Sequence, residues 1–248
     1  MRPLALLILG GVAYAAFLLA GLPAAIVAPR LEAATGGRVV LERASGSVWN
    51  GTAAMRLALP WAGIVLEEVQ WRFLPTRLAT GRLAAHVTAR AGRLVATAEV
   101  SRSPGAWQAS GLRARGDASA LALLVPLAAA WQPQGPLEID APHLAIEGGV
   151  LSGRASARWN DAALSLSTVR PLGDWRARLE AEGAPAKITL ATVKGPLRLS
   201  GAGTFTPAGR LAFAGEARAE AGREADLAPL LQLLGPRRAD GAHPLEVR

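Results

Sequence analysis

Residues 82–101, RLAAHVTARAGRLVATAEVS, contain the clearest structural pattern of the chain. In residues 82–90 and again in residues 93–101, apolar side chains alternate with mostly polar ones. Successive side chains of a β-strand point to opposite faces of a sheet, so a period of two is typical of a half-buried strand. Ala91-Gly92 separates the two stretches and supplies a turn. The segment therefore predicts a β-hairpin.

The same period of two recurs over much of the remaining chain. It is present in residues 69–73, 137–139, 151–159, 175–181, 188–190, 197–201 and 211–219. Glycine and alanine at many apolar positions favour strong curvature and close approach of the strands. We therefore expect a mainly β protein with an antiparallel, strongly curved sheet. Such a sheet can form a sandwich with a dry core filled by tryptophans, or a half-open groove for a lipid or another protein's strand.

Two stretches break this period and predict short amphipathic helices. Residues 117–130, DASALALLVPLAAA, begin with the capping residue Asp117 and carry leucines at helical spacing, although Pro126 should kink or end the helix. Residues 224–234, EADLAPLLQLL, place their leucines on one side and are followed by the stop signal Gly235-Pro236.

An internal repeat is indicated by three markers offset by 104 to 110 residues. The sequence PLEI at 136–139 matches PLEV at 244–247, and each follows one of the predicted helices. The other markers are Trp49 with Trp159, and Trp71-Arg72 with Trp175-Arg176. Chance similarity in an alanine- and arginine-rich chain is the alternative. The spacing predicts a first β-rich unit at 38–133 and a second at 134–248.

Residues 4–28, LALLILGGVAYAAFLLAGLPAAIVA, contain no charged residue. As a helix rising about 1.5 Å per residue, this segment is roughly 37 Å long, more than the about 30 Å of a bilayer's hydrocarbon core. A cleaved signal peptide is the alternative, but its apolar region is usually shorter. We expect an uncleaved transmembrane anchor at 4–28, with residues 1–3 in the cytoplasm and the bulk of the chain exported.

Composition and motifs argue against several functional classes. The chain has no cysteine, and His86, His143 and His243 are far apart in dissimilar contexts, so we expect surface histidines and no metal site. We find no catalytic or cofactor-binding motif and expect no catalytic residue and no cofactor. The net charge of +8 comes from single arginines spread along alternating segments, which indicates solvated strand faces rather than nucleic-acid binding. Attraction to an anionic membrane is the alternative.

Several short motifs together resemble the family of type II secretion system protein N, and the resemblance spans nearly the whole chain. They are GSVWNG (46–51), WRFLP (71–75), GRL (81–83), PLGDW (171–175), GPLRLSG (195–201) and LLQLLGP (230–236). In outline the chain is also similar to curved-sheet proteins of the AsmA type, which handle lipid or assist outer-membrane biogenesis.

This resemblance implies a non-enzymatic, single-pass inner-membrane protein with a β-rich periplasmic domain that assists export of folded proteins across the outer membrane. Its implied partners are other type II secretion components, either the inner-membrane platform or the secretin. A periplasmic lipid-binding groove is the alternative function. The residues expected to matter, as buried anchors and tight turns or as partner contacts, are Trp49, Gly51, Trp71, Pro75, Gly81, Trp159 and Trp175.

Overall fold

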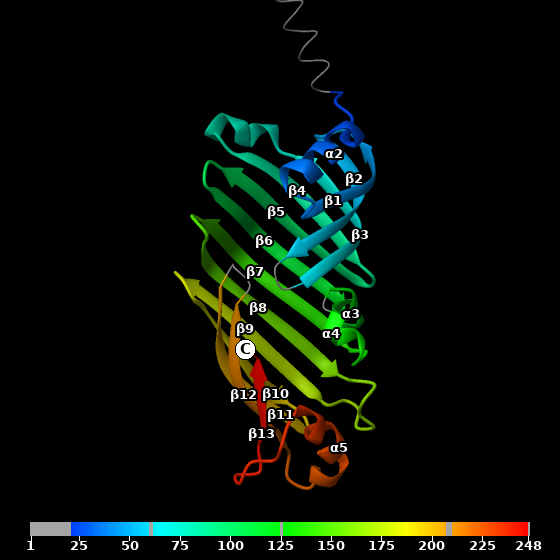
Figure 1. Cartoon of the computed structure of the whole chain (residues 1–248), viewed down its shortest axis with the longest axis vertical. Coiled ribbons are helices and arrows are strands. Elements are labelled where there is room, and N and C mark those ends of the chain that lie inside the picture. The colour runs from blue at the N-terminus through cyan, green and yellow to red at the C-terminus, as the bar shows by residue number, and fades with distance from the viewer. Residues whose placement is uncertain (1–20, 60–61, 125, 207–209, 248) are drawn as a thin grey trace, which may run out of the picture.

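The computed structural model describes residues 21–59, 62–124, 126–206 and 210–247. Within these ranges, thirteen strands form one open sheet in which each strand pairs with the next along the chain (Figure 1). Every pairing is antiparallel. The predicted mainly β, antiparallel class is therefore confirmed. The sandwich alternative is wrong, because the strands share a single hydrogen-bonded ladder instead of dividing into two stacked sheets.

The strands follow one another along the chain, and the connections from β6 to β7 and from β12 to β13 contain helices. The strands are β1 (Val39–Gly46), β2 (Asn50–Leu59), β3 (Ala62–Phe73), β4 (Leu83–Ala91), β5 (Leu94–Ser103), β6 (Ala106–Asp117), β7 (Pro136–Glu147), β8 (Val150–Ala162), β9 (Gly173–Glu182), β10 (Ala186–Lys194), β11 (Leu197–Phe205), β12 (Leu211–Ala219) and β13 (His243–Val247). The helices are α2 (Ala24–Ala34), η1 (Pro75–Thr80), η2 (Ala118–Ala120), α3 (Leu121–Leu124), α4 (Pro126–Ala129) and α5 (Glu224–Leu234).

The predicted hairpin is strands β4 and β5, with Ala91 paired to Leu94 next to the turn. Strands β1, β2, β6 and β13 are absent from the predicted alternating stretches, and β1 and β6 each contain an irregularity that interrupts the period of two. In β1 the register shifts between Glu42 and Ser45. In β6 a shift occurs opposite β5, where Gly111 has a positive φ of 61°. A bulge inserts an extra residue, so the side chains beyond it reverse their alternation in sequence.

Two helical connections join neighbouring strands at the predicted places. Between β6 and β7 the helix is divided into η2, α3 and α4, with Pro126 beginning α4. Asp117 caps this connection, because its carboxylate accepts a hydrogen bond from the amide of Ser119. Between β12 and β13, α5 has the predicted bounds of 224–234. The predicted boundary at 133/134 stays a prediction, since β7 pairs with both β6 and β8 and the sheet continues across it.

The face of the sheet that carries Trp159 and Trp175 is called the inner face here, and the opposite one the outer face. A buried cluster centred on Leu172 and Leu227 packs α5 against the inner face of the last strands. A second cluster, around Ala118 and Leu137, lies beneath the connection between β6 and β7. Figure 1 shows α2 near one end of the long axis and α5 near the other.

Residues 1–20, most of the predicted anchor, lie outside the described residues. Within the rest of the predicted span, Pro23 forms a β-bridge with Ser47, and a separate helix, α2, runs from Ala24 to Ala34 and contacts β1. The last residues of the predicted span are therefore divided between a bridge and a new helix. No helix in the described ranges combines the length and the apolar character needed to cross a membrane.

Candidate functional site

A cavity of about 450 Å³ opens on the inner face of the second half of the sheet. We call it the inner cavity. All of its lining residues are apolar: Leu121, Trp131, Leu137, Ile139, Ala157, Trp159, Leu164, Trp175, Ala177, Leu190, Leu197, Leu199, Phe213, Leu230, Leu234 and Leu245. Its volume falls within the about 300–1,000 Å³ of typical small-molecule sites. An apolar lining of this kind is compatible with hydrocarbon and offers no group for acid–base chemistry.

The cavity exists because several strands turn the same face toward it and a helix covers one side. Directly opposite residues in a sheet share a face, as Ala177 and Leu190 do across β9 and β10. Leu230 and Leu234 lie one helical turn apart on α5, so both point to the same side of that helix. The groove predicted as one of two alternatives is thus present, and Trp175, which is 6% exposed, also belongs to the buried cluster beside it.

Trp159 and Trp175 are directly opposite each other on β8 and β9. Their rings pack edge to face, with centroids 5.2 Å apart and planes at 86°. The Nε1 group of Trp159 donates a hydrogen bond to the carbonyl of Gln134 at 2.9 Å, and that of Trp175 donates to the carbonyl of Leu197 at 3.1 Å. With both polar atoms satisfied, only the apolar surfaces of the indoles remain for the cavity.

Trp49 and Trp71 have a different environment and do not line the inner cavity. The Trp71 Nε1 group donates to the carbonyl of Val48 at 3.0 Å, and its ring lies over Gly51, its cross-strand partner. A Cβ atom at Gly51 would stand only 2.5 Å from Cζ2 of Trp71. Trp49 packs against Phe73, with ring centroids 4.9 Å apart. Trp49, Gly51 and Trp71 therefore have contacts within the fold, and a role in partner contact stays a prediction.

Pro75 and Gly81 mark the two ends of η1. Pro75 is the first residue of this short helix, where its missing amide hydrogen is not needed. Gly81 ends the helix with a φ of 70°, a left-handed conformation that glycine adopts most readily. Both residues shape the connection between β3 and β4, and neither lines the inner cavity.

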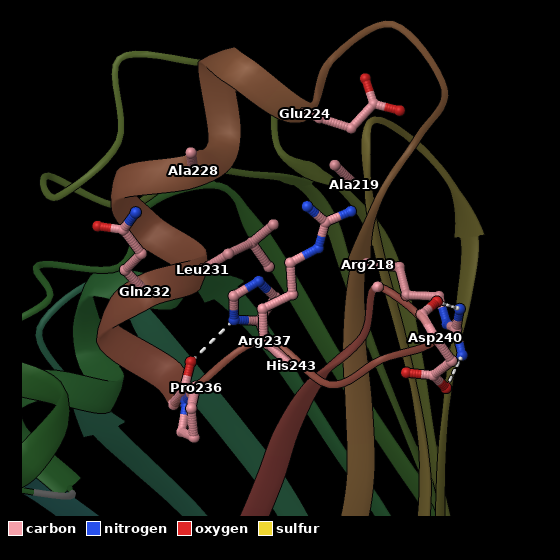
Figure 2. A pocket seen from close by; sticks show the side chains of 12 residues that line it. Arg218, Ala219, Glu224, Ala228, Leu231, Gln232, Pro236, Arg237, Asp240 and His243 are labelled. Carbon is pink, nitrogen blue, oxygen red and sulfur yellow. Dashed lines mark hydrogen bonds and ion pairs between the residues drawn. The ribbon is translucent and has the colours of Figure 1, made fainter.

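A second, polar pocket of about 570 Å³ lies between α5 and the segment leading into β13 (Figure 2). Arg218 and Asp240 face each other on one side, with a nitrogen–oxygen distance of 2.7 Å, and Arg218 also contacts Glu216 at 3.1 Å. A hydrogen bond from the Ala242 amide and the neighbouring Arg218 guanidinium lower the pKa of Asp240. Two of the charged side chains that line this pocket, Arg218 and Asp240, are therefore paired with each other.

His243 lines this pocket, so the prediction of surface histidines is wrong for this residue, whereas His86 and His143 are exposed. The side chain of His243 is 6% exposed, and Nδ1 lies 2.8 Å from the carbonyl oxygen of Gly235. In the described part of the chain, no three His, Cys, Asp or Glu side chains gather closely enough to hold a metal ion.

A comparison with protein families found a match that covers almost the whole sheet. The family model described as type II secretion system (T2SS), protein N matches residues 37–246. The chain belongs to this family. Membership makes it a component of the type II secretion system and confirms the resemblance expected from the short motifs. Searches of curated proteins and of solved structures found no match.

The part matched by the protein N family begins two residues before β1 and ends within β13, so it includes the inner cavity and both helical connections. Helix α2 lies outside it. The sequence-based prediction named Trp159 and Trp175 but missed other lining residues such as Leu190, Phe213 and Leu245. The alternation of apolar and polar residues along each strand could have indicated them, because each is one of the apolar residues on the inner face of its own strand.

Proposed function

We propose that this protein is a non-enzymatic component of the type II secretion system, anchored in the inner membrane with its sheet in the periplasm. There it assists export of folded proteins across the outer membrane through contacts with the inner-membrane platform or the secretin. The observation that carries this proposal is the family match, which extends over almost the entire sheet.

A deletion strain tests the role in secretion. Culture supernatant and periplasm are compared by quantitative mass spectrometry in the wild-type, deletion and complemented strains. We expect exoproteins to accumulate in the periplasm of the deletion strain and to return to the medium on complementation. Normal secretion by the deletion strain would contradict the proposal.

The membrane topology can be tested separately because the chain has no native cysteine. A cysteine at the exposed position Glu182 should react with a membrane-impermeant maleimide in intact spheroplasts. The matched control is Ala217→Cys, which is fully buried and should react only after denaturation. If Glu182→Cys is labelled only once the inner membrane is permeabilised, the bulk of the chain is not periplasmic.

The inner cavity favours a second candidate function, the binding of a lipid acyl chain. Its lining is wholly apolar, and burial of each methylene group contributes about 0.8 kcal/mol, so affinity should rise roughly fourfold per added carbon until the cavity is filled. Native mass spectrometry of the detergent-extracted protein should show bound phospholipid. A mass without lipid would retire this candidate.

Variants connect the bound lipid to the cavity. Ala177→Leu fills part of the space and Leu190→Gln adds polarity, so both should reduce the lipid-bound fraction. Val193→Gln is the matched control, because Val193 lies on the same strand as Leu190, is 55% exposed and does not line the cavity. Equal loss of lipid in Val193→Gln would indicate binding outside the cavity.

A further inference from the structure

The outer face of β6–β9 carries two neighbouring rows of polar side chains, which we call the arginine rows. Cross-strand pairing places Arg115, Glu138, Arg158 and Arg176 in one row, and Arg113, Asp140, Ser156 and Arg178 in the other. Directly opposite residues have Cβ atoms about 5 Å apart, so each row is a continuous line of adjacent side chains. Five arginines therefore share this area with two carboxylates.

These five arginines are not neutralised by ion pairs. Among the described residues, no ion pair within 4 Å includes any of them. Farther along the sheet the pattern differs, since Arg198 is paired with Glu220 at 2.5 Å and Arg218 with Asp240 at 2.7 Å. In the arginine rows, by contrast, Arg158 is directly opposite Arg176, an arrangement of like charges that destabilises a sheet.

Arg176 also has an unsatisfied polar atom. Its Nε group is buried and has no hydrogen-bond partner. A buried donor without a partner destabilises the folded state, so native proteins rarely keep one unless a ligand or water completes it. This donor and the opposed charges are separate observations, and both indicate that the area is suited to an anionic ligand.

Two hollows give an anionic group room to approach. One, of about 180 Å³, is lined by residues that include Arg176, Arg178 and Thr189. The other, of about 300 Å³, is lined by Arg154, Ser156 and Arg178 together with the carboxylates Asp140 and Glu180, so an anionic group has better access to Arg178 from the first hollow. Arg178 borders both hollows, and a guanidinium fork matches the two oxygens of a carboxylate.

We propose that the outer face of β6–β9 is a docking surface for an acidic polypeptide segment, whose carboxylates bind Arg158, Arg176 and Arg178. The interspersed acids Glu138 and Asp140 favour a polypeptide over a membrane. A uniformly anionic bilayer would be repelled at these two positions, whereas discrete carboxylates can match single guanidinium groups and leave the acids free. Such patterned complementarity determines register and partner choice. This inference stands on the charges of the outer face and does not rest on the proposed function.

Fluorescence anisotropy of the full-length, detergent-solubilised protein tests this surface with a labelled peptide of alternating glutamate and serine as the probe. We expect salt-sensitive binding that is weakened at least about tenfold in the variant R158Q/R176Q/R178Q. The matched control is R38Q/R82Q/R210Q, which removes the same charge at exposed positions outside the arginine rows and should weaken binding less than about twofold. Equal losses in the two variants would overturn the proposal.

Vesicles containing phosphatidylglycerol form the second arm of the experiment. If the vesicles bind in a manner that depends on the same three arginines while the peptide does not, the surface recognises a membrane and the proposal is wrong. Circular dichroism checks that the triple variant is folded, and removal of the opposed charges should leave its melting temperature unchanged or higher. Should the triple variant fail to fold, R158Q decides, because Arg158 is exposed: unchanged peptide affinity would overturn the proposal.

Discussion

The two halves of this protein use the same tryptophan pattern for different purposes. In the first half, Trp71 lies across the sheet from Gly51, and its ring covers the bare backbone there. At the position that the predicted repeat aligns with Trp71, Trp175 lies opposite Trp159, and both indoles line the inner cavity. The two tryptophans therefore differ in the residue opposite them on the neighbouring strand. They also differ in the element packed over them, because α5 packs beside Trp159 and Trp175.

This comparison shows that a tryptophan motif does not by itself define a binding site. Trp71 and Trp175 both donate their indole N–H to a main-chain carbonyl, at 3.0 and 3.1 Å, so the anchoring is shared. The glycine opposite Trp71 leaves room for its ring next to the backbone, whereas Trp159 and Trp175 pack edge to face and both line the cavity. The cavity is therefore a property of the pair and its surroundings.

The largest effect should follow from Trp175→Ala. Trp175 is 6% exposed and belongs to the buried cluster beneath α5, so its removal should lower the free energy of unfolding by about 3–5 kcal/mol. Chemical denaturation measures the change. Trp107→Ala is the matched control, because Trp107 is 51% exposed, and about 1 kcal/mol or less is expected there. Similar losses in both variants would mean that Trp175 does not hold the second half together.

Gly51→Ala tests the first half. The added Cβ would lie 2.5 Å from the Trp71 ring and 2.7 Å from the Ser45 carbonyl oxygen, so a loss of about 1–3 kcal/mol in the free energy of unfolding is expected. Gly63→Ala is the control in the adjacent strand, because a Cβ there meets no atom within 4 Å and stability should be kept or slightly raised. If Gly51→Ala is as stable as Gly63→Ala, Trp71 does not require a glycine beneath it.

The helical connections differ as well, and Asp117→Ala measures that difference. Asp117 caps the first connection, whereas Arg223, the residue before α5, makes no side-chain capping hydrogen bond. Asp117→Ala should therefore lower the free energy of unfolding by about 1 kcal/mol at neutral pH. Although partial burial opposes it, hydrogen bonds from Ser119 and Gly135 lower the pKa of Asp117. A carboxyl group with a lowered pKa stabilises the fold at pH values above its unfolded-state pKa of about 3.9. This stabilisation is lost as the pH falls through the folded-state pKa.

Thermal denaturation of Asp117→Ala and the wild type between pH 3 and pH 7 checks this expectation. The difference in stability should be largest near neutral pH and should narrow below about pH 4. Arg223→Ala is the control at the second connection and should show a smaller change. A constant difference for Asp117→Ala over the whole range would show that the ionised carboxylate contributes nothing.

Much of the sheet could be predicted from the sequence because alternation is local. The predicted stretch 211–219 has the same bounds as β12, and α5 was predicted at its observed residues. Strand β6 was missed because the bulge near Gly111 interrupts its period of two. The position of a bulge depends on pairing with the neighbouring strand, which the local sequence does not show.

The candidate site was less accessible to sequence reasoning. The repeat matched Trp49 to Trp159, yet Trp49 lies in the bend before β2 and Trp159 lies within β8. Whether a tryptophan fills a core or lines a cavity depends on the curvature of the sheet and on how closely α5 approaches, both of which are set by contacts between distant residues. The arginine rows likewise emerge only from the cross-strand register, since Arg115 and Arg158 are far apart in the chain.

Fluorine NMR of the full-length protein labelled with fluorotryptophan tests the difference between the two halves most directly. Signals are assigned through single tryptophan-to-phenylalanine variants, and a nitroxide-labelled fatty acid is added, with the unlabelled fatty acid as the control. We expect the nitroxide to broaden the signals of Trp159 and Trp175, which line the inner cavity, and to leave that of Trp71 sharp. Equal broadening of Trp71, or no broadening of Trp159 and Trp175, would contradict the account.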